Sequence, residues 1–184
     1  MTRKETIRNI TFRAIGIALF VVLSMCLRVP VFENYYLCLG YVVMTVYVWC
    51  FNWYDGIIIG FFGTILYSLI GQLGFNGLPG WAVGNIIVGL GIGLTLPFIK
   101  KINNKVVQVI LTAIVAIIFT FIGIELVKSV IDHFIVSQPV VVRMAKNFTS
   151  FIADAFVIVV SLPICAILEK PAQQLRYNGL NKGM

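Results

Sequence analysis

Charged side chains are scarce in this 184-residue chain. They make up 11% of the residues, against roughly a quarter in an average soluble domain, and the mean hydropathy is +0.99. So few charged groups cannot cover a water-facing surface of this size, particularly since 60% of the residues are hydrophobic. The scarcity excludes a soluble globular domain and predicts an integral membrane protein.

Catalytic and nucleotide-binding motifs are also missing. The sequence has no Walker motif, no HExxH and no Ser/His or paired-carboxylate constellation. The glycine run at residues 89–93 lies within an apolar stretch and is not followed by Lys-Ser/Thr, which favours helix packing over phosphate binding. The four cysteines lack the spacing of metal ligands. We therefore expect no enzyme activity, no cofactor and no metal site.

The basic residues are unevenly placed along the chain. Ten of the 14 lie before the first apolar run, around residues 100–105, or after residue 169. If the runs alternate across a bilayer, these three regions lie on one side, and the positive-inside rule makes that side cytoplasmic. The net charge of +7 therefore indicates topology, and a nucleic-acid partner is not favoured.

Apolar runs and the breaks between them predict an all-α membrane protein, a compact bundle of six transmembrane helices with both termini in the cytoplasm. We expect a single domain, residues 1–184, with helices at about 7–28, 37–52, 56–73, 81–100, 105–133 and 144–169. The second helix is short for a span. The fifth is roughly 40 Å long and exceeds a hydrocarbon core of about 30 Å. Pro163 is expected to kink the last helix, and Pro171 to mark its end.

Polar side chains within the helices gather in their outer third. Each is a candidate for function, because polar groups are costly in a bilayer. Glu125 and Lys128 share one helix face, Asn147 and Asp154 share another, and Asn85 lies little more than a turn below an outer loop. The predicted substrate-binding residues are Arg28, Glu33, Asn34, Asn76, Trp81, Asn85, Glu125, Lys128, Asn147 and Asp154.

Structural explanations exist for the same side chains. Glu125 and Lys128 can form a local ion pair, Asp154 can neutralise a nearby cation, and Asn85 can bridge helices. The inner halves of the middle helices carry almost no charge, so no polar file crosses the membrane as in a channel or a proton-coupled carrier. The pattern predicts an outer pocket that is closed at its inner end and needs a partner to move its ligand.

The first helix carries a stripe of small residues. Ala14 and Ala18 are four residues apart on one face, with Gly16 on the flank. Such a stripe lets the backbone of another helix approach closely. Two interpretations remain: packing within this bundle, or docking of another protein.

These features together resemble the substrate-binding S components of energy-coupling factor (ECF) vitamin transporters, which are six-helix membrane proteins of about this length. The resemblance covers essentially the whole chain. It rests on Ala14 to Ala18, which match the AxxxA motif of the family, on the glycine-rich stretch from Leu39 to Leu94, and on the predicted span count.

The resemblance implies a transport subunit of the bacterial cell membrane. It would bind a water-soluble vitamin or precursor on the outer side, then topple with a transmembrane coupling protein and two ATP-binding subunits that hydrolyse ATP. Ala14 and Ala18 would contact the coupling protein. Pyridoxine or hydroxymethylpyrimidine is the expected ligand, and pantothenate, riboflavin and folate are alternatives. The competing class is a non-transport structural or assembly protein.

Overall fold

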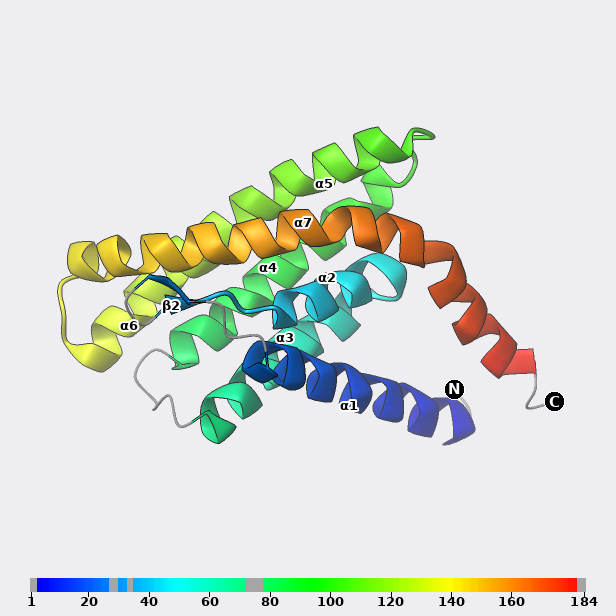
Figure 1. Ribbon diagram of the computed structural model, residues 1–184, viewed down its shortest axis with the longest axis horizontal. Helices are drawn as coiled ribbons and strands as arrows, with labels where there is room; N and C mark the ends of the chain where they lie inside the picture. The colour runs from blue at the N-terminus through cyan, green and yellow to red at the C-terminus, as the bar shows by residue number, and fades with distance from the viewer. Residues whose placement is uncertain (1–2, 27–29, 33–34, 72–77, 182–184) are drawn as a thin grey trace.

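The computed structural model describes residues 3–26, 30–32, 35–71 and 78–181 (Figure 1). Its helices pack into one bundle, in which α3 lies between α1, α2 and α4, and α7 packs along α2 and α5. The helices are α1 (Arg3–Cys26), α2 (Gly40–Cys50), α3 (Trp53–Ile70), α4 (Leu78–Ile99), α5 (Lys105–Thr120), the π-helical segment η1 (Phe121–Val127), α6 (Lys128–Val136) and α7 (Val140–Asn181).

Six helical rods form this bundle within the described residues, because α5, η1 and α6 run on as one continuous rod. Five of the rods are long and apolar enough to cross a membrane, and the sixth, α2, is a shorter apolar helix. The all-helical bundle predicted from the sequence is therefore confirmed. Its orientation across the membrane stays a prediction.

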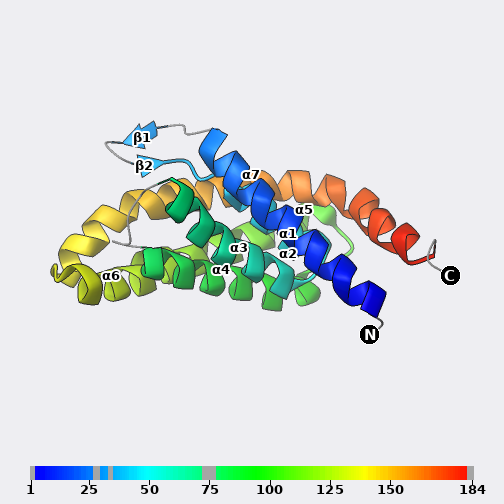
Figure 2. The same ribbon diagram turned by 90° about the horizontal axis from the view of Figure 1, so that it is seen from below.

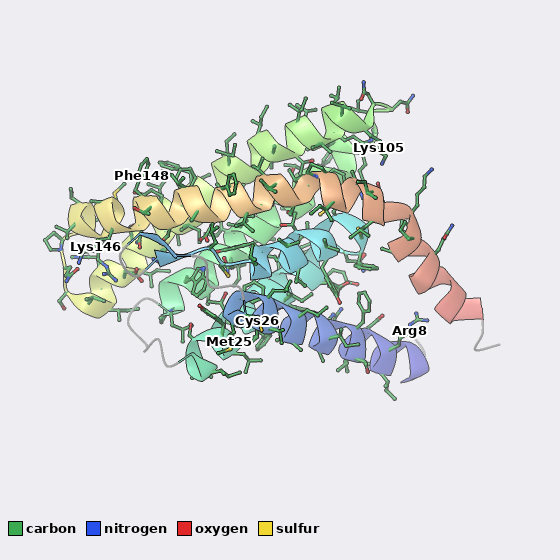
Figure 3. All side chains as sticks on the ribbon, in the orientation of Figure 1. Arg8, Met25, Cys26, Lys105, Lys146 and Phe148 are labelled. Carbon is green, nitrogen blue, oxygen red and sulfur yellow. The ribbon has the colours of Figure 1, made fainter. Side chains whose placement is uncertain are left out.

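The two ends of the bundle are easily told apart. The start of α1 and the end of α7 lie at one end, and the turn between α6 and α7 lies at the other (Figures 1 and 2). We call the first the terminal end and the second the distal end. Lys105 lies toward the terminal end and Lys146 at the distal end (Figure 3).

Helix boundaries differ from the predicted ones in two places. The loop expected between the first two helices contains a short antiparallel pair, β1 (Pro30–Phe32) and β2 (Tyr35–Tyr36). The last helix starts at Val140 and continues to Asn181, so Pro171 does not end it. Proline is tolerated in membrane helices where neighbouring groups satisfy the freed carbonyl. The red part of α7 turns away from the bundle (Figure 1).

The π-helical segment η1 is a third departure from expectation. The sequence predicts one long helix over 105–133, and the structure has a continuous rod over that range with seven residues of π-helix inside it. Such segments carry one extra residue per turn and are frequent at functional sites. Here the segment places Glu125 among buried residues.

Glycines make the close contacts between helices. In α4, Gly89 packs against Ile57, Gly91 against the ring of Phe119, and Gly93 against Trp53. Each position has no room for a Cβ atom, so the run at residues 89–93 is a packing seam, as the sequence predicts. It fixes α4 against both α3 and α5.

Candidate functional site

A hydrogen-bonded network joins α2, α3 and α4 through Tyr41 and Asn85. The Tyr41 hydroxyl donates to Asn85 Oδ1 at 2.7 Å and accepts from Trp81 Nε1 at 2.8 Å. Asn85 Nδ2 donates to Thr64 Oγ1 at 2.6 Å and to the Gly60 carbonyl at 3.3 Å. Asn85 is fully buried, and these bonds use both of its donors. Asn85 therefore bridges helices, and Trp81 is the more open member of the network.

Asp154 extends this network to α7. Its side chain is 5% exposed. It interacts with the Tyr41 hydroxyl and, electrostatically, with the Lys128 ammonium. Burial, and then the charge of Asp154, raise the pKa of the nearby Cys38 thiol to about 12. Cys38 therefore stays a neutral thiol beside this network.

A second cluster, at the distal end, holds α6 and α7 together. Lys128 Nζ donates to Asn147 Oδ1, and Asn147 Nδ2 donates to Ser129 Oγ at 2.9 Å. Asn147 is 3% exposed, so these bonds take place away from water. The structure thus brings Lys128 and Asn147, two of the predicted residues, into direct contact.

Asp132 is the acidic centre of the same cluster. Its Oδ2 lies 3.5 Å from Lys128 Nζ and 3.2 Å from Arg143 Nη2. The side chain is completely buried, and a Cβ on Gly80 would lie 2.5 Å from Oδ1. The start of α4 therefore packs directly on this ion pair.

Several buried polar atoms of this region find no hydrogen-bond partner within the described chain. Across all described residues, seven buried side-chain atoms have no hydrogen-bond partner, and five of these seven belong to residues 125–143. They are Glu125 Oε2, Asp132 Oδ1 and Oδ2, Gln138 Oε1 and Arg143 Nε. Native structures leave few such atoms unpaired, so water or a ligand is expected beside them.

The predicted site residues divide into three groups. Trp81, Asn85 and Asp154 belong to the Tyr41 network, and Lys128 and Asn147 belong to the distal cluster. Glu125 is buried between them, with one oxygen unpaired. Arg28, Glu33, Asn34 and Asn76 lie outside the described residues.

The sequence interpretation missed Tyr41, Thr64, Asp132 and Arg143 as members of these clusters. Asp132 carries a usable signal, because it lies four residues after Lys128 and seven after Glu125, on the same helix stripe. Tyr41 carries none, since a tyrosine in an apolar helix is ordinarily a packing residue.

At the terminal end, the polar groups pair with each other. Glu169 on α7 forms ion pairs with two lysines: its Oε1 lies 2.8 Å from Lys100 Nζ, and its Oε2 lies 2.7 Å from Lys105 Nζ. Arg13 Nε on α1 lies 2.7 Å from Asp55 Oδ1 on α3, and its guanidinium lies over the Tyr54 ring. These pairs tie α7 and α1 to the bundle.

The small-residue stripe of α1 lies on the outside of the bundle. Ala14 and Ala18 are both exposed, and large apolar neighbours on the same face, Ile15 and Leu19, are 52% and 46% exposed. Gly16 points the other way, against Ile59 and Tyr47. The two alanines therefore face outward and do not pack against other helices of this bundle.

Comparison with known proteins identifies the family. The family model described as "ECF-type riboflavin transporter, S component" matches residues 4–170. This chain belongs to that family. S components of this family are integral proteins of the plasma membrane, and this chain is one of them. The family model names riboflavin, so the pyridoxine or hydroxymethylpyrimidine type stays a prediction.

The fold of this S component is similar to that of a solved S component for biotin from an ECF-type ABC transporter. The TM-score is 0.58 at 14% sequence identity, over 92% of this chain and 95% of that chain. Two UPF0397 proteins from Streptococcus thermophilus, strains LMD-9 and CNRZ 1066, are each 34% identical over 92 residues, which is 50% of this chain and 50% of the relative. The chain thus spans about half the length of the curated relatives it matches.

Proposed function

We propose that this protein is the substrate-binding subunit of an ATP-driven importer for a water-soluble vitamin or vitamin precursor. The observation that carries the proposal is the group of buried polar atoms at residues 125–143 that lack a hydrogen-bond partner among the described residues, in a chain of the S component family. Asp132 and Arg143 also form an ion pair with each other, whereas Glu125 Oε2 has no ion pair in the described part of the chain. Unpaired polar atoms in a membrane protein are unfavourable unless a polar ligand or water completes them. The ligand would enter from the distal end, which we place outside the cell.

The charges of the distal cluster narrow the ligand class. Lys128 is held by Asp132 and Asn147, whereas Arg143 contacts Asp132 through Nη2 and keeps its Nε without a hydrogen-bond partner from the described residues. We favour a nitrogen heteroaromatic ligand with hydroxyl or amino groups, and the carboxylate-bearing pantothenate and folate are the alternatives. Riboflavin, which the family model names, and pyridoxine and hydroxymethylpyrimidine all fit that description.

Transport would require a transmembrane coupling protein and two separate ATPase subunits. The exposed face of α1 around Ala14 and Ala18 is the surface we assign to the coupling protein, because small side chains permit close helix contact. The S component would topple with that partner to release the ligand in the cytoplasm.

A binding screen without nucleotide tests the proposal. The purified chain in detergent or nanodiscs is titrated with riboflavin, pyridoxine, hydroxymethylpyrimidine, pantothenate, folate and biotin, by thermal shift and calorimetry. We expect one heteroaromatic ligand to bind at nanomolar to micromolar concentration and to raise the unfolding temperature. If none of them binds, a structural or assembly role is favoured instead.

A further inference from the structure

Three buried carboxyl groups lie on two neighbouring elements of the bundle, the continuous rod of α5, η1 and α6 and the helix α7. Glu125 is 4% exposed, Asp132 is 0% exposed, and Asp154 is 5% exposed. Among the described residues, the lysine and arginine side chains buried or half-buried with them are Lys128 and Arg143. Within this part of the chain, the three carboxylates therefore outnumber these two cations when all are ionised.

The partners of the three carboxyl groups differ. Asp132 has both cations within ion-pair distance, and Asp154 lies near the Tyr41 hydroxyl and within the influence of the Lys128 charge. Glu125 has neither kind of partner: its Oε2 is buried without a hydrogen bond, and no ion pair reaches it from the described residues. Among the three carboxyl groups, Glu125 is the one for which the described residues provide neither a cation nor a hydrogen-bond donor to Oε2.

Lys128 does not complete Glu125. The two residues are three apart, and the lysine charge acts on Glu125 through space. However, the Lys128 ammonium is directed to Asn147 and Asp132, which hold it on the α7 side. The structure therefore does not have the Glu125–Lys128 ion pair that is one interpretation of the sequence, and Lys128 pairs with Asp132 instead.

The backbone at Glu125 is firmly held. Glu125 lies inside η1, two residues after Gly123, whose backbone packs on that of Gly84 in α4. This contact fixes the backbone from which the Glu125 side chain projects, and the carboxyl group lies buried there. An unpaired buried carboxylate in a fixed position is suited to a partner that arrives from outside.

We propose that Glu125 determines ligand specificity by binding a basic nitrogen of the substrate, either a protonated amine or the amino group and protonated ring nitrogen of an aminopyrimidine, both of which donate to the carboxylate. The substrate is then an amino-bearing nitrogen heteroaromatic compound. The inference rests on the proposed function, because it needs a ligand at this cluster. Charge-assisted pairing in a buried site gives both the affinity and the selection against uncharged analogues.

Matched ligand pairs test this assignment. The pairs are pyridoxamine with pyridoxine, and hydroxymethylpyrimidine with its analogue that lacks the amino group; riboflavin is measured alongside. In the wild type we expect the amino-bearing member of one pair to bind about tenfold or more tightly than its partner. In Glu125→Gln that preference should shrink to about threefold or less, while Lys146→Gln, at an exposed site, should keep it.

The outcomes separate the two proposals. Tight binding of riboflavin, or of any panel member without a basic nitrogen, that is equal in the wild type and Glu125→Gln overturns the role of Glu125 and leaves the proposed function standing. Absence of binding by every vitamin overturns both. If Glu125→Gln does not fold, the preference within the ligand pairs, measured on the wild type alone, decides the question.

Discussion

Gly84 and Gly123 pack backbone against backbone. A Cβ on Gly84 would lie 2.7 Å from the Gly123 carbonyl oxygen, and one on Gly123 would lie 2.6 Å from the Gly84 carbonyl oxygen. This contact holds η1 against α4, and so fixes the position of Glu125 relative to Asn85, one residue beyond Gly84.

Substitution of either glycine should therefore disturb both stability and ligand binding. We expect Gly84→Ala to lower the free energy of unfolding by about 1–3 kcal/mol, because the backbones must move apart to admit a methyl group. Leu94→Ala, on an exposed position of the same helix, is the control. Denaturant unfolding in detergent measures the difference, and an equal effect of the two variants contradicts the tight contact.

The exposed alanines of α1 provide a test of coupling. Ala14→Trp and Ala18→Trp add bulk on the outer face without touching the polar clusters. We expect each to abolish co-purification with the coupling protein and vitamin uptake, while ligand affinity is unchanged. Ile167→Trp, on an exposed position of α7, should retain both. Loss of ligand binding in the alanine variants would show that the stripe packs within the bundle.

The Arg13–Asp55 pair lies directly before the alanine stripe. Since Asp55 is 7% exposed in its side chain, removal of Arg13 leaves a buried carboxylate whose one remaining hydrogen-bond partner among the described residues is Asn52. We expect Arg13→Gln to lower the free energy of unfolding by about 1–2 kcal/mol. The exchanged double variant, Arg13→Asp with Asp55→Arg, should recover part of the loss in a double-mutant cycle. A double variant no better than the sum of the single variants argues against the ion pair.

The Tyr41 hydroxyl is the centre of the network that joins α2 to α4. Tyr41→Phe leaves Trp81 Nε1 and Asn85 Oδ1 without this partner. We expect a loss of about 1–3 kcal/mol in the free energy of unfolding, since Asn85 is fully buried and Trp81 is half-buried. Tyr54→Phe, at a site 37% exposed, should cost little. Thermal unfolding followed by intrinsic fluorescence compares the two.

The periodicity of the sequence predicts the helical architecture. It does not predict local features that depend on contacts with residues distant in sequence. The apolar runs predict six rods because each must span or be buried in the bilayer. The π-helical turn at 121–127 has no counterpart in the periodicity of the sequence, and it lies where Gly123 contacts α4. The pair β1–β2 is too short to leave an alternating pattern.

For the site, depth in the membrane was the informative signal. It selected Asn85, Lys128 and Asn147, which the structure places in hydrogen-bonded clusters. It could not show that Lys128 pairs with Asp132 rather than Glu125, because all three lie on one stripe and only the packing of α7 decides between them. Partners distant in sequence, such as Tyr41 for Asn85, are set by tertiary structure alone.

The most direct test of the account is equilibrium binding of the best ligand from the vitamin screen to variants at the two ends of the bundle. Lys128→Met and Asn147→Leu alter the distal cluster, and Lys170→Met removes an exposed charge near the terminal end. The account predicts that the distal variants weaken binding about tenfold or more, and that Lys170→Met leaves it unchanged. Full affinity in folded Lys128→Met and Asn147→Leu would contradict it.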